Sequence, residues 1–166
     1  MSKVVFFNLP GASGHVNPAI SIVEELVERG EQVIFYASEE FRDRFSELGV
    51  EFRTYNQWTD HEITDEITHD ILPTVLAQFD MLLDVIHPLM KITREDAPDY
   101  IIYDSVCIWG KFIAQALGVP AISCITMVVS HPFIMVTDWR ISARVVKTLI
   151  MGLPHAMWAR RMLKET

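Results

Sequence analysis

The chain has 166 residues, half of them apolar and 22% charged, which is the composition of one globular domain with a real hydrophobic core. Its formal net charge of −8 argues against nucleic acid as a partner, because no basic surface is left to neutralise phosphates. The two cysteines, Cys107 and Cys124, show no CxxC spacing, and the first strand begins too early for a signal peptide, which predicts a cytoplasmic protein with reduced thiols in its core.

The first 30 residues predict a buried strand that leads through a turn into a helix. Val4-Val5-Phe6-Phe7 is an uninterrupted apolar run, as in strands covered on both faces. From 19 to 28 the apolar residues recur at helical spacing, and Gly30 is placed to end the helix. We expect Asn17 to be the N-cap of this helix and Pro18 its first residue, where a missing N–H costs nothing.

The turn between this strand and this helix carries Gly11, Gly14 and a single imidazole, His15. A strand-to-helix turn presents backbone N–H groups and the positive end of a helix dipole, so it favours an anion or developing negative charge nearby. The same field disfavours a second positive charge, which helps to keep His15 neutral and able to accept a proton.

Strand and helix patterns then alternate with short links, which is typical of βαβ units and a parallel sheet. Strands are predicted at 32–36, 50–54, 98–104 and 121–124. Helices are predicted at 40–48 after the N-cap Ser38, at 74–94 with a kink or break at Pro88, at 109–117 before Gly118, around 141–150 and from 156 onward. Residues 55–70 are rich in acidic and polar side chains and are expected to form a long surface excursion. The predicted fold is α/β, a Rossmann-like doubly wound parallel sheet with helices on both faces.

One segment raises the question of a membrane span, because residues 118–137 contain no Asp, Glu, Lys or Arg. Pro120, Ser123, Ser130 and Pro132 interrupt it, so a buried strand followed by an apolar loop fits better. We expect no membrane span.

His15 and Asp104 are the residues most informative about chemistry. In a doubly wound sheet the first strand lies centrally and the fourth returns to lie beside it, so the ends of these two strands meet at the ligand crevice. An aspartate that accepts a hydrogen bond from one imidazole nitrogen fixes the tautomer and leaves the other nitrogen as a base. Two structural readings stay open: a histidine at the start of a helix bonded to a carbonyl, and Asp104 as the N-cap of the next helix.

These residues stand in motifs that resemble a known family. The Gly-His-Val-Asn-Pro turn at 14–18, the strand ending Tyr103-Asp104-Ser105 and the Trp109-Gly110 helix are similar to the N-terminal half of UDP-dependent glycosyltransferases of the GT-B fold, in particular the bacterial macrolide and flavonoid branch. The spacing between His15 and Asp104 matches as well. The resemblance implies that residues 1–166 are one acceptor-binding domain, half of a GT-B fold.

The resemblance also implies roles for the matching residues. His15 would deprotonate the hydroxyl of a small hydrophobic acceptor and Asp104 would orient His15, while a hexose moves from a UDP-sugar by an inverting displacement without metal or cofactor. Ser13 and Gly14 would lie near the donor phosphate. An apolar acceptor pocket is implied, although apolar residues at helical spacing are more often plain core; its candidates are Trp58, Phe79, Leu83, Met127, His131 and Phe133.

Such enzymes hold the nucleotide sugar in a second domain, through a His-Cys-Gly-type motif and an acidic residue that contacts the sugar. Cys107 and Cys124 do not stand in that context. The chain is therefore expected to lack the C-terminal nucleotide-sugar domain, as a truncated enzyme or one subunit of a split one. Without a donor half it should bind an acceptor and transfer little or nothing.

Other classes fit the residues less well. A dinucleotide-binding oxidoreductase would show Gly-x-Gly-x-x-Gly and an acid at the end of the second strand, where this chain has Gly11-x-x-Gly14 and Tyr36-Ala37. A phosphate-cradling NTPase would need Lys-Ser or Lys-Thr after the glycines. A non-catalytic acceptor-binding or partner-docking subunit would share the fold and the pocket, and it stays open.

One metal hypothesis remains. His61, Asp65 and His69 would share a face if their segment is helical, and such a row of ligands can bind zinc. A solvated acidic surface is the more common meaning of this pattern, so we expect no metal.

Overall fold

The computed structural model describes residues 2–11, 13–59 and 71–126. In this part of the chain five parallel strands form one sheet in the order β3-β2-β1-β4-β5, which confirms the predicted doubly wound α/β fold. The strands are β1 (Lys3–Phe7), β2 (Gln32–Ala37), β3 (Glu51–Thr54), β4 (Tyr100–Asp104) and β5 (Ala121–Cys124). The helices are α1 (Ser13–Glu28), α2 (Arg42–Ser46), α4 (Ile71–Asp96) and α5 (Ile108–Leu117), and Glu39–Phe41 forms a 3₁₀ turn.

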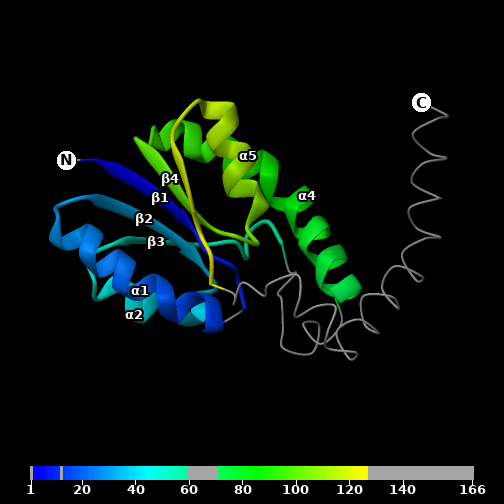
Figure 1. Ribbon diagram of the computed structural model, residues 1–166, viewed down its shortest axis with the longest axis horizontal. Helices are drawn as coiled ribbons and strands as arrows, with labels where there is room; N and C mark the ends of the chain where they lie inside the picture. The colour runs from blue at the N-terminus through cyan, green and yellow to red at the C-terminus, as the bar shows by residue number, and fades with distance from the viewer. Residues whose placement is uncertain (1, 12, 60–70, 127–166) are drawn as a thin grey trace, which may run out of the picture.

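The sheet separates two hydrophobic cores, one under each layer of helices. Figure 1 shows α1 and α2 on one side of the sheet and α4 and α5 on the other. Successive side chains of a strand point to opposite faces, so Val4 and Phe6 of β1 pack with α1 and α2, whereas Val5 and Phe7 pack with α4 and α5. This two-sided burial explains why β1 is an apolar run without alternation.

Helix α1 begins earlier than its sequence predicts. Asn17 and Pro18 were the expected N-cap and first residue, but the helix starts at Ser13 and Pro18 lies inside it. Gly11, at φ 80°, turns the chain ahead of the helix, and its N–H donates to the side chain of Ser38. Such tertiary contacts outweigh the loss of the bond that residue 18 would make to the residue 14 carbonyl. His15 consequently lies in the first turn of the helix rather than in a loop.

The predicted helix at 40–48 is shorter in the structure and begins differently. Residues Glu39–Phe41 form a 3₁₀ turn and only Arg42–Ser46 is α-helical. Ser38 occupies the N-cap position of the 3₁₀ turn, yet its side chain makes no capping hydrogen bond. Its hydroxyl instead accepts the N–H of Gly11, so it connects the end of β2 to the turn before α1.

Two further segments differ from the sequence prediction. Helix α4 runs from Ile71 to Asp96 with Pro88 inside it, so of the predicted kink or break at Pro88 the break is wrong and the kink stays a prediction. The stretch after β3 was expected to be a surface excursion, but Tyr55 is 1% exposed and belongs to the core under α4 and α5. Residues 60–70 of that excursion lie outside the described part of the chain.

Helix α5 ends as its sequence predicts, at Gly118 in the left-handed conformation (φ 71°). The following strand β5 is also as predicted, and it contributes exposed apolar side chains at Ile122 and just beyond at Ile125. In residues 2–11, 13–59 and 71–126 we find no helix that is long and apolar enough to cross a membrane. The helices predicted around 141–150 and from 156 lie outside the described residues.

Candidate functional site

The structure brings together the two residues that the topology predicts to meet. Asp104 is the last residue of β4, and His15 lies in the first turn of α1, which follows β1. Strands β1 and β4 pair directly, with Phe7 opposite Tyr103, so both side chains reach the carboxyl edge of the sheet. Nδ1 of His15 lies 2.8 Å from Oδ2 of Asp104. This edge is where open α/β sheets bind their ligands.

The Asp104 carboxylate is 1% exposed, and both of its oxygens accept hydrogen bonds. The backbone N–H of Val106 donates to Oδ1 at 3.0 Å, and the hydroxyl of Thr126 donates to Oδ2 at 2.9 Å. Asp104 is not the N-cap of α5, a position that belongs to Cys107, so that reading is wrong. The buried carboxylate therefore has a hydrogen-bond donor at each of its two oxygens.

The contacts of His15 assign its tautomer. An ionised carboxylate can only accept hydrogen bonds, so the proton lies on Nδ1 and Nε2 keeps its lone pair. His15 does lie at the start of a helix, but within the described residues the partners of its Nδ1 are the side chains of Asp104 and Thr126 rather than a backbone carbonyl. The His15 side chain is 20% exposed, which leaves it open to a ligand. The arrangement can accept a proton at Nε2 and stabilise the resulting cation through Asp104.

Thr126 is part of this cluster and is not among the site residues predicted from the sequence. It lies two residues after β5, whose Cys124 pairs with Asp104 of β4. Its hydroxyl is 2.7 Å from Nδ1 of His15 as well as 2.9 Å from Oδ2 of Asp104. The signal was available: a hydroxyl residue directly after the strand that neighbours β4 must reach the same edge of the sheet.

Buried polar groups fix the backbone that carries His15. Asn8, 1% exposed at the end of β1, donates from Nδ2 to the His15 carbonyl at 3.3 Å and accepts the N–H of Leu9 at Oδ1. The hydroxyl of Tyr55 donates to the carbonyl of Asn8 at 3.0 Å. Burial raises the pKa of Tyr55 well above its ordinary value, so it remains a donor at neutral pH.

The predicted acceptor-binding residues are only partly described. Phe79 and Leu83 of α4 are 52% and 68% exposed, whereas the buried side of that helix is formed by Met81, Val85 and Leu89. Trp58 is half-buried and packs against the core near Tyr36, with 6.5 Å between the ring centroids. The other three candidates, Met127, His131 and Phe133, lie outside the described residues.

Ser13 and Gly14, the predicted neighbours of a donor phosphate, are both exposed in the first turn of α1. A Cβ placed on Gly14 would meet no atom within 4 Å, so the space around this turn is open. These residues therefore lie inside the first turn of α1 rather than in the turn before the helix that the sequence predicts, and their place beside a donor phosphate stays a prediction.

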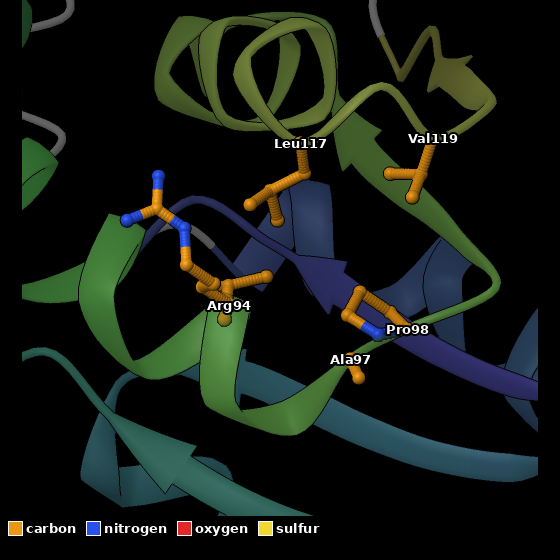
Figure 2. A pocket seen from close by; sticks show the side chains of 6 residues that line it. Arg94, Ala97, Pro98, Leu117 and Val119 are labelled. Atoms are coloured by element: carbon orange, nitrogen blue, oxygen red, sulfur yellow. The ribbon is translucent and has the colours of Figure 1, made fainter.

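Two surface hollows formed by described residues lie at the opposite edge of the sheet from His15. A hollow of about 270 Å³ separates the ends of α4 and α5 and is lined by Thr93, Arg94, Ala97, Pro98, Leu117 and Val119 (Figure 2). Another, of about 380 Å³, lies where β1, β2 and β3 begin, lined by Lys3, Gln32, Val33, Ile34, Gly49 and Glu51. Neither contains a residue of the predicted site.

The described residues also bear on metal binding and on the thiols. In residues 2–11, 13–59 and 71–126, no three His, Cys, Asp or Glu side chains are grouped to hold a metal ion. The His61, Asp65 and His69 segment lies outside these ranges. Cys107 is buried and Cys124 half-buried, and both are free thiols.

A doubly wound parallel sheet with a His–Asp pair at its carboxyl edge defines a class of α/β ligand-binding domains. Within that class, the family of this chain is shown by its sequence. Residues 5–103 match the glycosyltransferase family 28 N-terminal domain, and the chain belongs to this family.

Curated relatives extend the match beyond residue 103. The chain is 30% identical over 138 residues to the uncharacterized UDP-glucosyltransferase YojK of Bacillus subtilis, covering 80% of this chain and 34% of that protein. It is 31% identical over 133 residues to the demethyllactenocin mycarosyltransferase of Streptomyces fradiae, covering 74% of this chain and 29% of that protein. The chain thus spans about a third of the length of the curated relatives it matches.

The fold is that of the N-terminal part of a GT-B glycosyltransferase. The structure of the glycotransferase of kitacinnamycin superimposes with a TM-score of 0.65 at 21% identity, over 88% of this chain and 38% of that one. The resemblance inferred from the motifs around His15 and Asp104 is therefore confirmed for family and fold.

Proposed function

We propose that this chain is the acceptor-binding half of an inverting glycosyltransferase, with His15 as general base and Asp104 as the residue that orients it. The observation that carries the proposal is the 2.8 Å contact between Nδ1 of His15 and Oδ2 of the buried Asp104, which leaves Nε2 as the free basic nitrogen. Membership in a glycosyltransferase family supplies the reaction class.

The proposed reaction transfers a hexose from a UDP-sugar to a hydroxyl group. His15 Nε2 takes the hydroxyl proton as the acceptor oxygen forms a bond to the anomeric carbon. The bond from that carbon to the UDP oxygen breaks, and UDP leaves with the electron pair from the opposite face, which inverts the configuration. The proton on Nδ1 stays hydrogen-bonded to Asp104, so the imidazolium that forms faces a negative charge. UDP-sugar is a co-substrate here, and the proposed step uses no metal or cofactor.

The proposed acceptor is a small hydrophobic aglycone. Three large apolar side chains of α4, namely Leu76, Phe79 and Leu83, are exposed at 43%, 52% and 68%. Their spacing of three and four residues places them on one side of the helix. Exposed apolar surface of this kind favours a ligand or partner with apolar faces. The UDP-sugar would be held by a second domain. Residues 1–166 form the acceptor-binding domain and would transfer sugar only together with that donor-binding domain.

Calorimetric titration of the chain with a polyphenolic acceptor, and separately with UDP, tests the assignment. We expect heat from the acceptor and none from UDP, because the donor belongs to the other half. Tight binding of UDP or NAD without heat from the acceptor would show that the crevice is itself a nucleotide site and would overturn the proposal.

The role of His15 is tested on a protein that includes a donor-binding half, supplied on the same polypeptide or as a partner. The variant His15→Ala should abolish UDP release in the presence of acceptor and UDP-glucose while leaving acceptor affinity nearly unchanged. The matched control is His87→Ala, at an exposed position of α4. If acceptor binds but no form transfers sugar, the chain is a non-catalytic binding subunit.

A further inference from the structure

We propose that Thr126 is a positioning residue of the site: its hydroxyl holds the Asp104 carboxylate in the orientation that aims Oδ2 at Nδ1 of His15. The effect of Thr126 on sugar transfer rests on the proposed function, whereas its effect on the orientation of the His15 imidazole does not. Thr126 lies outside the 5–103 span of the family match.

The three polar atoms of the cluster form a closed triangle. The distances are 2.8 Å from His15 Nδ1 to Asp104 Oδ2, 2.7 Å from His15 Nδ1 to Thr126 Oγ1, and 2.9 Å from Thr126 Oγ1 to Asp104 Oδ2. All three lie within normal hydrogen-bonding range, so the hydroxyl contacts both members of the pair.

Counting hydrogens shows where the hydroxyl proton must go. The triangle holds two hydrogens, one on Nδ1 and one on Oγ1, and one oxygen, Oδ2, that can only accept. The Nδ1 hydrogen points to Oδ2 or to Oγ1, and in either case the hydroxyl hydrogen is directed to Oδ2. In the other tautomer the proton would be on Nε2, and the lone pair of Nδ1 would face the lone pairs of Oδ2 at 2.8 Å. The single hydroxyl hydrogen of Thr126 could then be donated to Nδ1 or to Oδ2 but not to both.

Thr126 also completes the hydrogen bonding of a buried carboxylate. Val106 N–H donates to Oδ1 and Thr126 to Oδ2, so the carboxylate is held from both sides and its rotation is prevented. Asp104 is 1% exposed, so water cannot replace a lost donor without a local opening. Removing the hydroxyl therefore releases the rotation of the carboxylate and, with it, the orientation of the imidazole.

The sheet, rather than a flexible loop, brings Thr126 to this position. Cys124 is paired with Asp104, and the backbone N–H of Ser105 donates to the Cys124 carbonyl at 2.8 Å. Thr126 follows two residues later, so it starts from a backbone hydrogen-bonded to β4. Its β-branched side chain has few χ1 rotamers, which suits a fixed donor.

The first test is proton NMR of the imidazole N–H of His15 in the 166-residue chain, with His15→Gln to assign the signal. Thr126→Val keeps the shape and removes the hydroxyl, and Thr126→Ser keeps the hydroxyl. We expect a slowly exchanging Nδ1–H signal in the wild type and the Ser variant, and its loss or broadening in the Val variant. An equally sharp signal in the Val variant would overturn the proposal. Should the Val variant fail to fold by circular dichroism, Thr126→Ala provides the same comparison.

The second test measures transfer kinetics in a protein with a donor-binding half. Misorientation of the base should lower kcat of the Val variant roughly 10- to 100-fold and leave KM for the acceptor within about twofold, and the Ser variant should retain most of kcat. Equal kcat in the Val variant and wild type contradicts the proposal. If no form transfers sugar while the NMR difference persists, the proposed function fails and the positioning role of Thr126 stands.

Discussion

The imidazole of His15 is held through both its side chain and its main chain. Asp104 and Thr126 contact Nδ1, and Asn8 donates to the His15 carbonyl. These contacts come from the ends of β1 and β4 and from the segment after β5, so three neighbouring strands determine one ring orientation. The identity of His15 and Asp104 could be predicted from the sequence because strand order alone brings them together. Thr126 was missed because it has no motif of its own and its role depends on pairing with β4.

The substitution Asp104→Asn should reverse the tautomer of His15. Val106 N–H needs an acceptor, so the amide oxygen takes the place of Oδ1 and the NH₂ group faces Nδ1. An NH₂ group can only donate, so Nδ1 must accept and the proton moves to Nε2, which can no longer act as a base. We expect kcat to fall by roughly 10²- to 10⁴-fold in a protein with a donor half.

Acceptor affinity measured by calorimetry should be unchanged in the Asp104→Asn variant. The control is Asp99→Asn, just before the start of the same strand and at the opposite edge of the sheet. It should keep full kcat. Retained turnover in Asp104→Asn would remove the tautomer argument.

Among the elements, α5 packs on the sheet through an unusually close contact at Gly110. A Cβ added there would lie 2.4 Å from Cβ of Tyr103 and 3.2 Å from the ring of Phe7. The Cβ of Tyr103 is attached to the strand backbone and cannot move aside alone, so the helix itself would have to shift. Helix α5 follows Asp104 and Val106, and its closeness to β4 helps to fix the edge at which the site forms.

The variant Gly110→Ala should therefore destabilise the protein, by about 1–3 kcal/mol for overpacking, less the gain of up to about 1 kcal/mol from replacing a helical glycine. Gly14→Ala is the matched control, because a Cβ at that helical position meets nothing within 4 Å. It should leave stability equal or slightly higher. Urea unfolding of the two variants measures both values, and equal effects would contradict the packing argument.

The elements also show what local sequence rules can predict. All five strands of the described sheet were expected to within two residues, since apolar runs between turn residues are a strong local signal. The starts of α1 and α2 were not predicted correctly. The Ser38 hydroxyl accepts the N–H of Gly11, in the turn before α1, instead of capping the helical turn that follows it. Capping rules describe a helix by itself, and here tertiary contacts decide where the helix begins.

Considered as a whole molecule, the chain buries several weak acids in their neutral form. Burial raises the pKa of the Cys107 thiol and of the Tyr36 and Tyr55 phenols. The ordinary values are 9.0 for the thiol and 10.0 for the phenols. Above these values the unfolded chain has released protons that the folded chain still retains, so alkali favours unfolding.

The free energy of unfolding should consequently fall as the pH rises above about 9. Each such group contributes a slope of about 1.4 kcal/mol per pH unit between its unfolded and folded pKa. Urea unfolding at a series of alkaline pH values measures this slope. Cys107→Ala should reduce it in the interval just above pH 9, and an unchanged slope there would show that the thiol ionises equally in both states.

The topology was the most predictable property of the whole molecule. Alternating strands and helices joined by short links permit few parallel arrangements, and the observed order has β1 in the centre. The acceptor pocket could not be predicted in the same way. Phe79 and Leu83 follow the same helical periodicity as core residues, and only the neighbours present in three dimensions distinguish an exposed apolar side chain from a buried one.

The position of Thr126 after the fifth strand has a consequence for biosynthesis. His15 lies 89 residues before Asp104 and 111 residues before Thr126. Contacts of such long sequence separation form late in folding, because each requires a large loop to close. On the ribosome, a nascent chain that has emerged only as far as β4 can bring Asp104 to His15 but lacks the hydroxyl that fixes it. The hydrogen-bonded cluster of His15, Asp104 and Thr126 is thus complete only when β5 and the residues just after it have left the exit tunnel.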